Sequence, residues 1–486
     1  ITRCGIGCAD PIADATPASI TSAALTTRAK AVGQTIVFCR LSVVFLAALA
    51  VAHGAVFQAA DYGAKGDGKT IDTRYIQKAI DAAARTHGTV VFKPGIYLTG
   101  ALFLKSGMQL RVDKGATIRG VQDTSAYPER PTRIAGIDMT WPSALINVYK
   151  QSNVKIYGKG TIDGNGKYWW DQYWALRKKY QPRGLRWAAD YDCKRARLIQ
   201  VYKSSNVILQ GLTLERSGFW TVHLCYSNHL KVDGITIRNN IGGRGPSTDG
   251  IDVDSSLHVL IENCDISDND DAICMKAGRD ADGLRVNRPT EYVTVRNCTI
   301  RAGAAGFTVG SETSGGIHYV NVSGLRVLSG VPNGILFKSA RTRGGTMSDI
   351  DIRDIHLDGV RTPVKIALDW DPSYSYAKIP PGIKNVPDYW RILATPVPPK
   401  EGLPHLRDVR ISHLIATAAR RAFSVSGYPN DLIQNFRFDH VNIRAKTAGS
   451  IADAENWNFA DTQVHTADGS RVALKHCRNV TGLRNR

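Results

Sequence analysis

A short strand-forming phrase recurs along most of this chain and constrains the possible folds more than any other feature of the sequence. Each copy alternates apolar and polar residues and ends in Gly, Asn or Asp, and a second short alternating segment follows it. The copies that end at residues 211, 234, 263, 297, 324 and 354 are separated by 23, 29, 34, 27 and 30 residues. A phrase that recurs at such intervals indicates a solenoid or a β-propeller.

The content of each repeat favours the solenoid. A propeller blade needs four antiparallel strands in about 40 residues, whereas these repeats are shorter, uneven in length and rich in Ser-Asn, Asn-Gly and Asp-Gly turns. We therefore predict an all-β fold, a single-stranded parallel β-helix with a stack of Val, Ile and Leu side chains inside. Similar phrases at 409–413 and 436–440 extend the coils toward the C-terminus.

Three segments depart from the repeat. Residues 73–84 place their apolar side chains at helical spacing, which predicts an amphipathic N-terminal helix that caps the open end of the stack. Beyond this helix, helical signals nearly vanish. Residues 168–187 and the proline-rich residues 380–404 interrupt the phrases, and we expect them to be loops that project from the coils. We assign residues 53–486 to one β-helix domain.

Residues 1–52 are interpreted as a leader that contains a signal peptide. Three basic residues precede an apolar run over 41–52 that ends in Ala-Val-Ala, which predicts cleavage after Ala52. The run is shorter than the roughly 20 residues that span a membrane; the alternative is a buried hydrophobic strand or helix. The residues ahead of the signal are interpreted as an upstream misread of the start codon. We expect a secreted or periplasmic protein with no membrane segment after signal removal.

The charge balance predicts a polyanionic partner. The chain has 62 Lys and Arg residues against 43 Asp and Glu residues, a formal net charge of +19. Nucleic acid, anionic lipid and acidic polysaccharide all suit this charge, and export favours an extracellular polyanion over nucleic acid. The nine cysteines include no Cys-x-x-Cys pair, so a zinc site is not indicated. For the six cysteines beyond residue 52, buried thiols are favoured over up to three disulfide bridges.

Acidic residues cluster in the middle of the chain. Asp249 and Asp270 are 21 residues apart, close to one coil, so they are expected on neighbouring rungs about 4.8 Å apart and facing one cleft. Asp271 joins them only if the chain bends, because successive strand residues point to opposite faces. Crowding raises the pKa of at least one carboxyl group, which yields an acid beside ionised bases, as glycosidases need. Turn residues that only bind backbone amides, or a calcium site, are the alternatives.

Several motifs occur in a fixed order through the mature chain. They are AADYGAKGDG at 59–68, IQKAID at 76–81, GTIDGNG at 160–166 with Trp169 and Trp170, STDG at 247–250, Asp270-Asp271, GFTVGSE at 306–312 and Lys338. Together they resemble glycoside hydrolase family 28, the polygalacturonases and their relatives. The resemblance implies a right-handed β-helix and an inverting hydrolysis with Asp270 as general acid and Asp249 and Asp271 activating water. It also implies Lys338 as a substrate-binding residue, no metal or other cofactor, and a monomer acting on acidic plant cell-wall polysaccharide.

Two positions depart from the family pattern. The family's Gly-His-Gly corresponds to Gly303-Ala304-Ala305, and its Arg-Ile-Lys corresponds to Leu336-Phe337-Lys338. The missing histidine and arginine bind the galacturonate carboxylate in polygalacturonases, so rhamnogalacturonan is expected to be a better substrate than plain polygalacturonate. Arg341 or Arg343 is a candidate for the lost cation.

Two other functions remain open at this stage. A pectate lyase shares the β-helix and the acidic substrate but uses calcium and a basic residue, and a non-catalytic β-helix would bind a glycan without cutting it. Asp249, Asp270 and Asp271 favour the hydrolase over the non-catalytic protein.

Some aromatic residues and histidines also need an interpretation. The segment from Trp370 to Tyr376 is expected to reach over the cleft, while His223 and His318 are interpreted as structural. Four tryptophans of the interrupting segment and its surroundings either line a sugar-binding wall or pack that segment onto the coils, namely Trp169, Trp170, Trp174 and Trp187.

Overall fold

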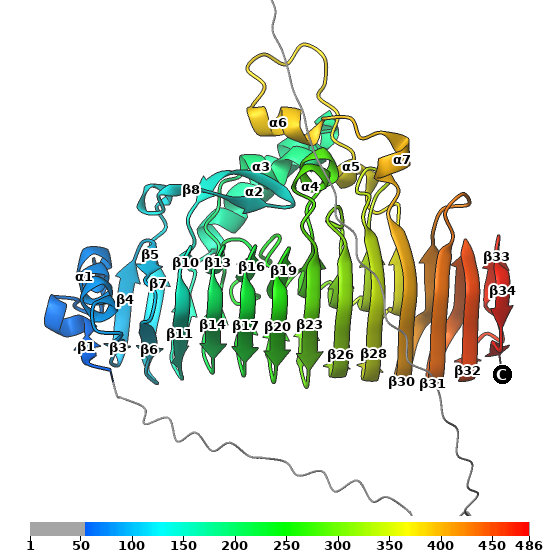
Figure 1. Cartoon of the computed structure of the whole chain (residues 1–486), viewed down its shortest axis with the longest axis horizontal. Helices are drawn as coiled ribbons and strands as arrows, with labels where there is room; N and C mark the ends of the chain where they lie inside the picture. Colours follow the sequence, from blue (N-terminus) through cyan, green and yellow to red (C-terminus); the bar gives the residue numbers. More distant parts are fainter. Residues whose placement is uncertain (1–53, 486) are drawn as a thin grey trace, which may run out of the picture. The chain divides into compact units, whose positions relative to one another are not determined.

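Parallel strands that pair from one coil to the next build this protein (Figure 1). The computed structural model describes residues 54–485. Within them, 33 strands join in one continuous β-system wound as a right-handed parallel β-helix, and β8 (Glu129–Ile134) and β9 (Ile137–Pro142) form a separate antiparallel hairpin. The predicted all-β fold is therefore confirmed. The predicted leader over residues 1–52 lies outside the described residues.

Each coil contributes up to three strands, which stack into three sheets. The first sheet contains β5 (Leu102–Leu104), β10 (Ile146–Tyr149), β13 (Ile199–Tyr202), β16 (Val222–Cys225), β19 (Ile251–Asp254), β22 (Asp271–Lys276), β25 (Ala305–Val309), β27 (Asn333–Lys338), β29 (Thr362–Ala367) and β33 (Ala473–Lys475). The second contains β1 (Val56–Gln58), β3 (Thr89–Phe92), β6 (Gln109–Val112), β11 (Ser152–Gly158), β14 (Ser205–Gln210), β17 (Asn228–Asp233), β20 (Leu257–Glu262), β23 (Thr290–Arg296), β26 (Ile317–Val327), β28 (Thr346–Asp358), β30 (His405–Ser426), β31 (Ile433–Ala452), β32 (Ala454–Thr466) and β34 (Arg478–Thr481). The third contains β2 (Asp67–Ile71), β4 (Gly95–Thr99), β7 (Ala116–Gly120), β12 (Thr161–Asp163), β15 (Thr213–Glu215), β18 (Thr236–Arg238), β21 (Asp265–Ser267) and β24 (Thr299–Ala302), and the short β35 (Arg484–Asn485) pairs with β32.

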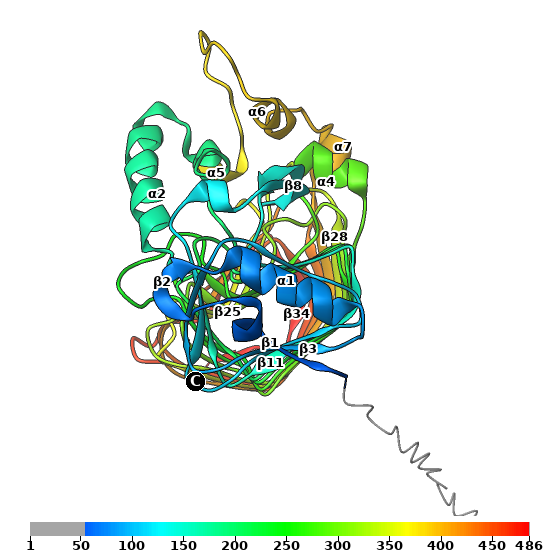
Figure 2. The same cartoon turned by 90° about the vertical axis from the view of Figure 1, so that its left-hand side faces the viewer.

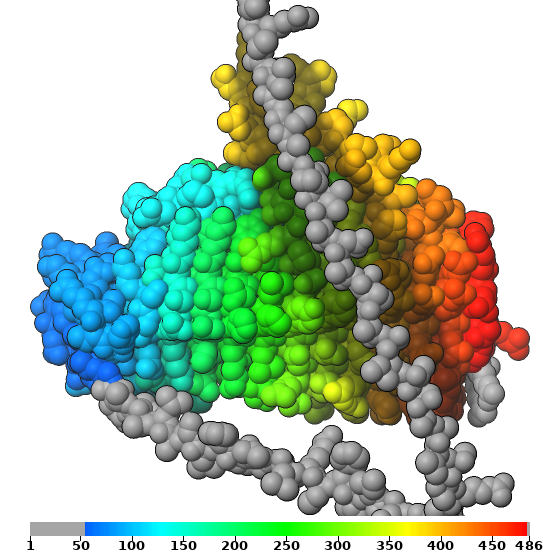
Figure 3. Space-filling model, in the orientation of Figure 1, coloured from blue at the N-terminus to red at the C-terminus, as the bar shows by residue number. Residues whose placement is uncertain are grey.

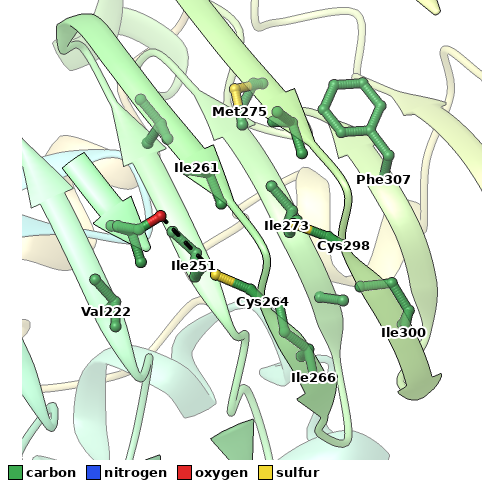
Figure 4. Packing of buried hydrophobic residues seen from close by; sticks show 14 of the residues in the cluster. Val222, Ile251, Ile261, Cys264, Ile266, Ile273, Met275, Cys298, Ile300 and Phe307 are labelled. Carbon is green, nitrogen blue, oxygen red and sulfur yellow. Dashed lines mark hydrogen bonds between the residues drawn. The ribbon is translucent and has the colours of Figure 1, made fainter. Parts of the chain in front are cut away.

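Apolar side chains of successive coils stack in register inside the helix. One row runs through the first sheet and into the end of β30, a long strand that continues from the second sheet into the first. Its residues, all fully buried, are Val222, Ile251, Ile273, Phe307, Ile335, Val364 and Phe423. Figure 4 shows part of this row beside the buried thiols of Cys264 and Cys298. All six cysteines of the described residues are free thiols, and five of them are buried as predicted, while Cys477 is half-buried.

A helix closes the N-terminal end of the stack. Helix α1 (Thr73–Ala84) lies across the end of the coils in Figure 2 and buries Ile76, Ala79, Ile80 and Ala83, which confirms the predicted cap. In the space-filling view, side chains of successive coils form parallel rows between the blue end and the red end (Figure 3).

The interrupting segments are more helical than the sequence predicted. Residues 168–187, expected to be a loop, contain most of α2 (Lys167–Tyr180), followed by short turns at Arg186–Ala188 and by α3 (Ala189–Asp192). Basic residues at the end of α2 suit the negative end of its dipole. The helices α4 (Asp280–Val286), α5 (Pro372–Ser375), α6 (Asp388–Leu393) and α7 (Pro399–Gly402) lie along the same long side of the coils as α2 (Figure 1).

Candidate active site

Carboxyl groups gather where the chain enters the strands of the first sheet. Asp249 precedes β19 and Asp270 precedes β22, and these two strands are neighbouring rungs in which Ile251 pairs with Ile273. The chain bends at Asn269 and Asp270, and β22 begins at Asp271, which provides the bend that the sequence required. Asp249, Asp270 and Asp271 are thereby brought together at one edge of the sheet.

A pocket with about 570 Å³ of empty space lies over these acids. Its floor comes from the first sheet and the turns before it, and its walls come from the α2–α3 segment and from the loop around α5. Residues that line it include Arg186, Asp190, Phe219, Trp220, Ser247, Asp249, Asp270, Lys276, Ser311, Glu312, Lys338, Trp370, Asp371 and Tyr374. The segment after Trp370 thus reaches the pocket, as predicted.

Two of the acids that line the pocket, Asp249 and Asp270, have raised pKa values. Burial raises the pKa of Asp249 well above its ordinary value, and the charge of Asp270 adds to this effect. Burial also raises the pKa of Asp270, with the charge of Asp271 as the next cause. Asp249 is 4% exposed, while Asp270 is half-buried and lies more open to the pocket. A carboxyl group with a raised pKa beside other carboxylates can act as a proton donor.

Lys338 pairs with the third acid. Its Nζ lies 2.6 Å from Asp271 Oδ2 and also lines the pocket. Burial alone would lower the pKa of Lys338, but the charge of Asp271 outweighs burial and raises it, so the amine stays cationic. The second oxygen of Asp271, Oδ1, is buried and has no hydrogen-bond partner within the described residues.

A second lysine, Lys276, contacts Asp249 and two acids that the sequence analysis did not assign, Asp252 and Glu312. Lys276 Nζ lies 3.5 Å from both Asp249 Oδ2 and Asp252 Oδ1, and 3.3 Å from Glu312 Oε2. Burial acts to raise the pKa of Glu312, but the charges of Lys276 and Arg343 outweigh it and hold this pKa at about 2. The motif GFTVGSE at 306–312 was the available sequence signal for Glu312, and the nearby Asp270-Asp271 pair was the signal for Lys276.

Neither arginine proposed to replace the lost cation lines the pocket. Arg343 is fully buried, pairs with Asp280 and donates a hydrogen bond to the Ser311 carbonyl. The Arg341 guanidinium lies 4.4 Å from the centre of the Tyr428 ring. This part of the sequence analysis was wrong because spacing along the chain did not show that Arg343 is directed into a buried ion pair.

The family positions that depart from the pattern lie near the site. Ala304 donates a backbone hydrogen bond of 2.6 Å to the Asp270 carbonyl, and Leu336 is buried on β27. Neither side chain can bind a carboxylate, which leaves Arg186, Lys276 and Lys338 as the cations that line the pocket.

The tryptophans of the interrupting segment pack that segment onto the coils. Trp169, Trp170 and Trp187 are each about 1% exposed, and Trp170 Nε1 donates to the Ser217 carbonyl. None of the four predicted tryptophans lines the pocket, whose aromatic lining comes instead from Phe219, Trp220, Trp370 and Tyr374. Trp370 and Tyr374 belong to the segment that the sequence analysis placed over the cleft, whereas no sequence motif marked Phe219 and Trp220.

His223 is buried behind the pocket. Arg197 Nη1 must donate, so His223 Nδ1 accepts at 2.8 Å and Nε2 donates to Asp254 Oδ2 at 3.3 Å. Burial lowers the pKa of His223 to about 4, so it is a neutral structural residue at physiological pH. His318 is half-buried on β26 and lies within hydrogen-bond distance of Ser348, which also supports a structural role.

Two buried groups of side chains have metal-ligand chemistry within residues 54–485. In the first, His223, Cys225 and Asp254, the ligand atoms already meet Arg197 and Arg133, the latter 2.9 Å from Asp254. In the second, Asp249, Asp271 and Cys274, Lys338 contacts Asp271, and burial raises the pKa of the Cys274 thiol well above its ordinary value. Cations at the ligand atoms and a protonated thiol make both groups poor metal sites.

Comparisons with known proteins agree with this geometry. Residues 100–386 match the family model described as glycosyl hydrolases family 28, and residues 56–127 match rhamnogalacturonase A/epimerase, pectate lyase-like. A probable polygalacturonase of Vitis vinifera is 33% identical over 308 residues, which cover 61% of this chain and 60% of that protein. An endo-polygalacturonase of Pectobacterium carotovorum is 28% identical over 67% of this chain and 76% of its own length.

A solved structure extends the match over nearly the whole fold. The exopolygalacturonase of Thermotoga maritima is 26% identical and superposes with a TM-score of 0.68 over 87% of this chain and 92% of its own. The family model alone spans more than half of the sequence, including the predicted acids and Lys338. The chain therefore belongs to glycoside hydrolase family 28.

Proposed function

We propose that this protein is a polygalacturonase-type hydrolase that cuts α-glycosidic bonds of pectic polysaccharide with inversion of configuration. The observation that carries the proposal is the meeting of Asp249, Asp270 and Asp271 at one edge of the first sheet, where Asp249 and Asp270 line the pocket and Asp271 pairs with Lys338, which also lines it. Family membership and polygalacturonase relatives support the same activity.

Asp270 is the general acid in this proposal. Its raised pKa and its place in the pocket suit a carboxyl group that gives its proton to the glycosidic oxygen as the bond to the anomeric carbon breaks. Asp249 and Asp271 act together as the base: one carboxylate takes a proton from water, and the water oxygen bonds to the opposite face of the anomeric carbon. One sugar unit thereby leaves with a new hydroxyl group and the other with a new reducing end.

Lys338 is the substrate-binding cation. Its ammonium is held in place by Asp271 and has further donors for the carboxylate of an acidic sugar. The aromatic rings of Trp220 and Trp370 at the same pocket offer flat apolar surfaces for sugar rings.

Replacement of the acid tests the function. Asp270→Asn should lower turnover of pectic polysaccharide by about 10²- to 10⁴-fold, because the proton donor is lost, while the thermal unfolding transition stays nearly unchanged. A reducing-end assay measures turnover, and Asp171→Asn, on the exposed face of α2, is the matched control with a normal rate.

Three outcomes contradict the proposal. Normal turnover by Asp270→Asn, Asp249→Asn and Asp271→Asn alike would remove the assigned site. Proton NMR that shows retained configuration in the first product would exclude the inverting mechanism. Products with an unsaturated, ultraviolet-absorbing end would identify a lyase, and polymer binding without new reducing ends would identify a binding protein.

We also propose that the enzyme is exported and acts as a secreted or periplasmic monomer on plant cell walls. The leader pattern that ends at Ala52 and the positive net charge support this location. Within residues 54–485, no helix is long and apolar enough to cross a membrane. N-terminal sequencing of the exported protein should begin at or just after His53; retention of residues 41–52 would contradict the proposed cleavage.

A further inference from the structure

A row of cations follows the edge of the first sheet beyond the pocket, toward the C-terminal coils. We call these residues the cationic row: Lys365, Arg361, Arg421, Arg420 and Lys446. Lys365 is next to Leu336 in register, one rung farther along the stack. Lys365 and Lys338 lie 5.1 Å and 4.9 Å from the centre of the same Trp370 ring. The row therefore begins at a wall of the pocket.

The rest of the row continues on the chain segments that lead into the first sheet, where Arg420 and Arg421 belong to β30 and Lys446 to β31. Arg361 directly precedes β29, just as Asp270 directly precedes β22. The backbone N–H groups of Arg420 and Arg421 donate to the Arg361 carbonyl at 3.2 Å and 3.0 Å, so these residues lie on adjacent rungs. Lys446 follows on the next coil, where Ala419 pairs with Ala445.

A groove runs between these segments. It has about 660 Å³ of empty space and is lined by Gly330, Val331, Pro332, Gly359, Val360, Arg361, Ala418, Arg420 and Lys446. Three of its lining residues are cations and none is an acid. The groove therefore suits an anionic ligand.

Within the part of the chain that the structure describes, the cations of the row have no acidic partners. Within residues 54–485 none of the five side chains forms an ion pair, whereas Arg353, Arg407 and Arg410 on the same coils pair with Asp354, Asp408 and Asp439. Lys365 is half-buried, and burial, with the charges of Lys338, Arg361 and Arg421, lowers its pKa. Like charges that crowd without a counter-charge are stabilised by an anion that binds among them.

We propose that the cationic row binds carboxylates of the acidic polysaccharide chain whose neighbouring units occupy the pocket. Rungs of a parallel sheet are about 4.8 Å apart, comparable to one sugar unit, so a chain laid along the stack meets a new cation at each rung or two. The inference rests on the proposed function and adds a binding region for the part of the substrate outside the pocket. Affinity is then expected to rise with the length of the acidic chain.

Binding of galacturonate oligomers of two lengths tests the row. The double variant Arg361→Gln/Arg420→Gln is made in the Asp270→Asn background, which prevents turnover, and dissociation constants are measured by calorimetry. For a long oligomer we expect the dissociation constant to rise about 10-fold, because two exposed charge contacts are lost. For a trimer, which the pocket region holds, we expect a change of less than about twofold. Added salt should weaken binding of the long oligomer less in the variant than in its parent.

The matched control is Arg437→Gln/Arg444→Gln, which removes the same charge from exposed positions of β31 outside the row. This control should bind both oligomers like the parent. The inference would be overturned if the row variant and its parent bound the long oligomer with equal affinity. It would also be overturned if the row variant weakened binding of both oligomers equally, or if the control variant weakened binding of the long oligomer as much as the row variant does. Release of reducing ends by the unmodified protein is measured separately, so failure of the row and failure of the proposed hydrolysis give different results.

Discussion

At the scale of one residue, Asp268 shows how the acidic cluster lowers the stability of the folded protein at neutral pH. Both of its oxygens are buried and have no hydrogen-bond partner within the described residues. Burial raises its pKa well above 3.8, and the charges of Asp249, Asp270 and Asp271 add to this shift. The folded protein therefore keeps a proton here that the unfolded chain loses as the pH rises above 3.8, so stability declines over that range.

Asp268→Asn should remove this pH-dependent loss. We expect the free energy of unfolding at pH 7 to rise by about 1 to 3 kcal/mol, with little gain near pH 3, where the carboxyl group is protonated in both states. Denaturant unfolding at the two pH values measures the effect. Asp265→Asn is the opposite control: burial acts to raise the pKa of Asp265, but Arg301 and Arg238 outweigh it and lower it, so this variant should lose stability at pH 7. A destabilised Asp268→Asn protein at pH 7 would contradict the assignment.

Lys365 bears on the choice of substrate. The absence of cationic side chains at Ala304 and Leu336 predicts weak discrimination for contiguous galacturonate, but Lys365 lies one rung from Leu336 and has no acidic partner within the described residues. We therefore expect polygalacturonate to be the better substrate, contrary to the expectation from the two departures alone. Lys365→Met should lower kcat/KM on polygalacturonate by about 10-fold or more and on rhamnogalacturonan by less, since a charge-assisted contact contributes about 1.5 to 3 kcal/mol. A clear preference of the unmodified enzyme for rhamnogalacturonan would restore the earlier expectation.

At the scale of elements, the two interrupting segments support each other above the pocket. Trp390 of α6 packs edge-on against Trp187 at 5.0 Å, and its Nε1 donates to Asp192. Trp220, which lines the pocket, belongs to the same apolar cluster. The walls of the pocket thus depend on contacts between segments about 200 residues apart.

Trp390→Ala should loosen these walls without unfolding the coils. We expect faster amide hydrogen exchange in residues 186–192 and 388–393 and a KM for polymer raised several-fold, because the cluster loses an aromatic side chain. Trp390→Phe, which keeps the ring but not the N–H group, should lie between the variant and the parent. Unchanged exchange in both segments would show that they do not depend on this contact.

The elements also show which parts of the structure the sequence could predict. The coils repeat one pattern, so each copy of the phrase predicts the same strand and turn, and the stacked row from Val222 to Phe423 follows from it. Helix α2 was missed because Trp169, Trp170 and Tyr173 bury a cluster of rings that lacks a regular apolar stripe. Asp249 and Asp270 could be paired from their one-coil spacing, whereas the positions of Lys276 and Trp370 depend on side-chain direction and on a long insertion.

At the scale of the whole molecule, charge explains why so basic a chain is compatible with a site rich in acids. The sequence carries 62 basic residues, yet the pocket places acids beside Lys276 and Lys338, while the cationic row lies outside it. The cationic row is thus the surface that attracts a polyanion, and the neighbouring pocket is the surface that carries the proton-transferring acids.

The strict register between coils has a consequence for how such a protein can change over evolutionary time. A side chain keeps its direction around the axis when a whole coil is inserted or lost, because successive coils pair in register. Duplication of a coil beyond β29 would therefore lengthen the surface beside the pocket by one step of about 4.8 Å without reorienting Asp249, Asp270 or Asp271. One mutation can therefore change the length of polymer that the protein contacts, and a separate mutation can change the chemistry at the bond that is cut.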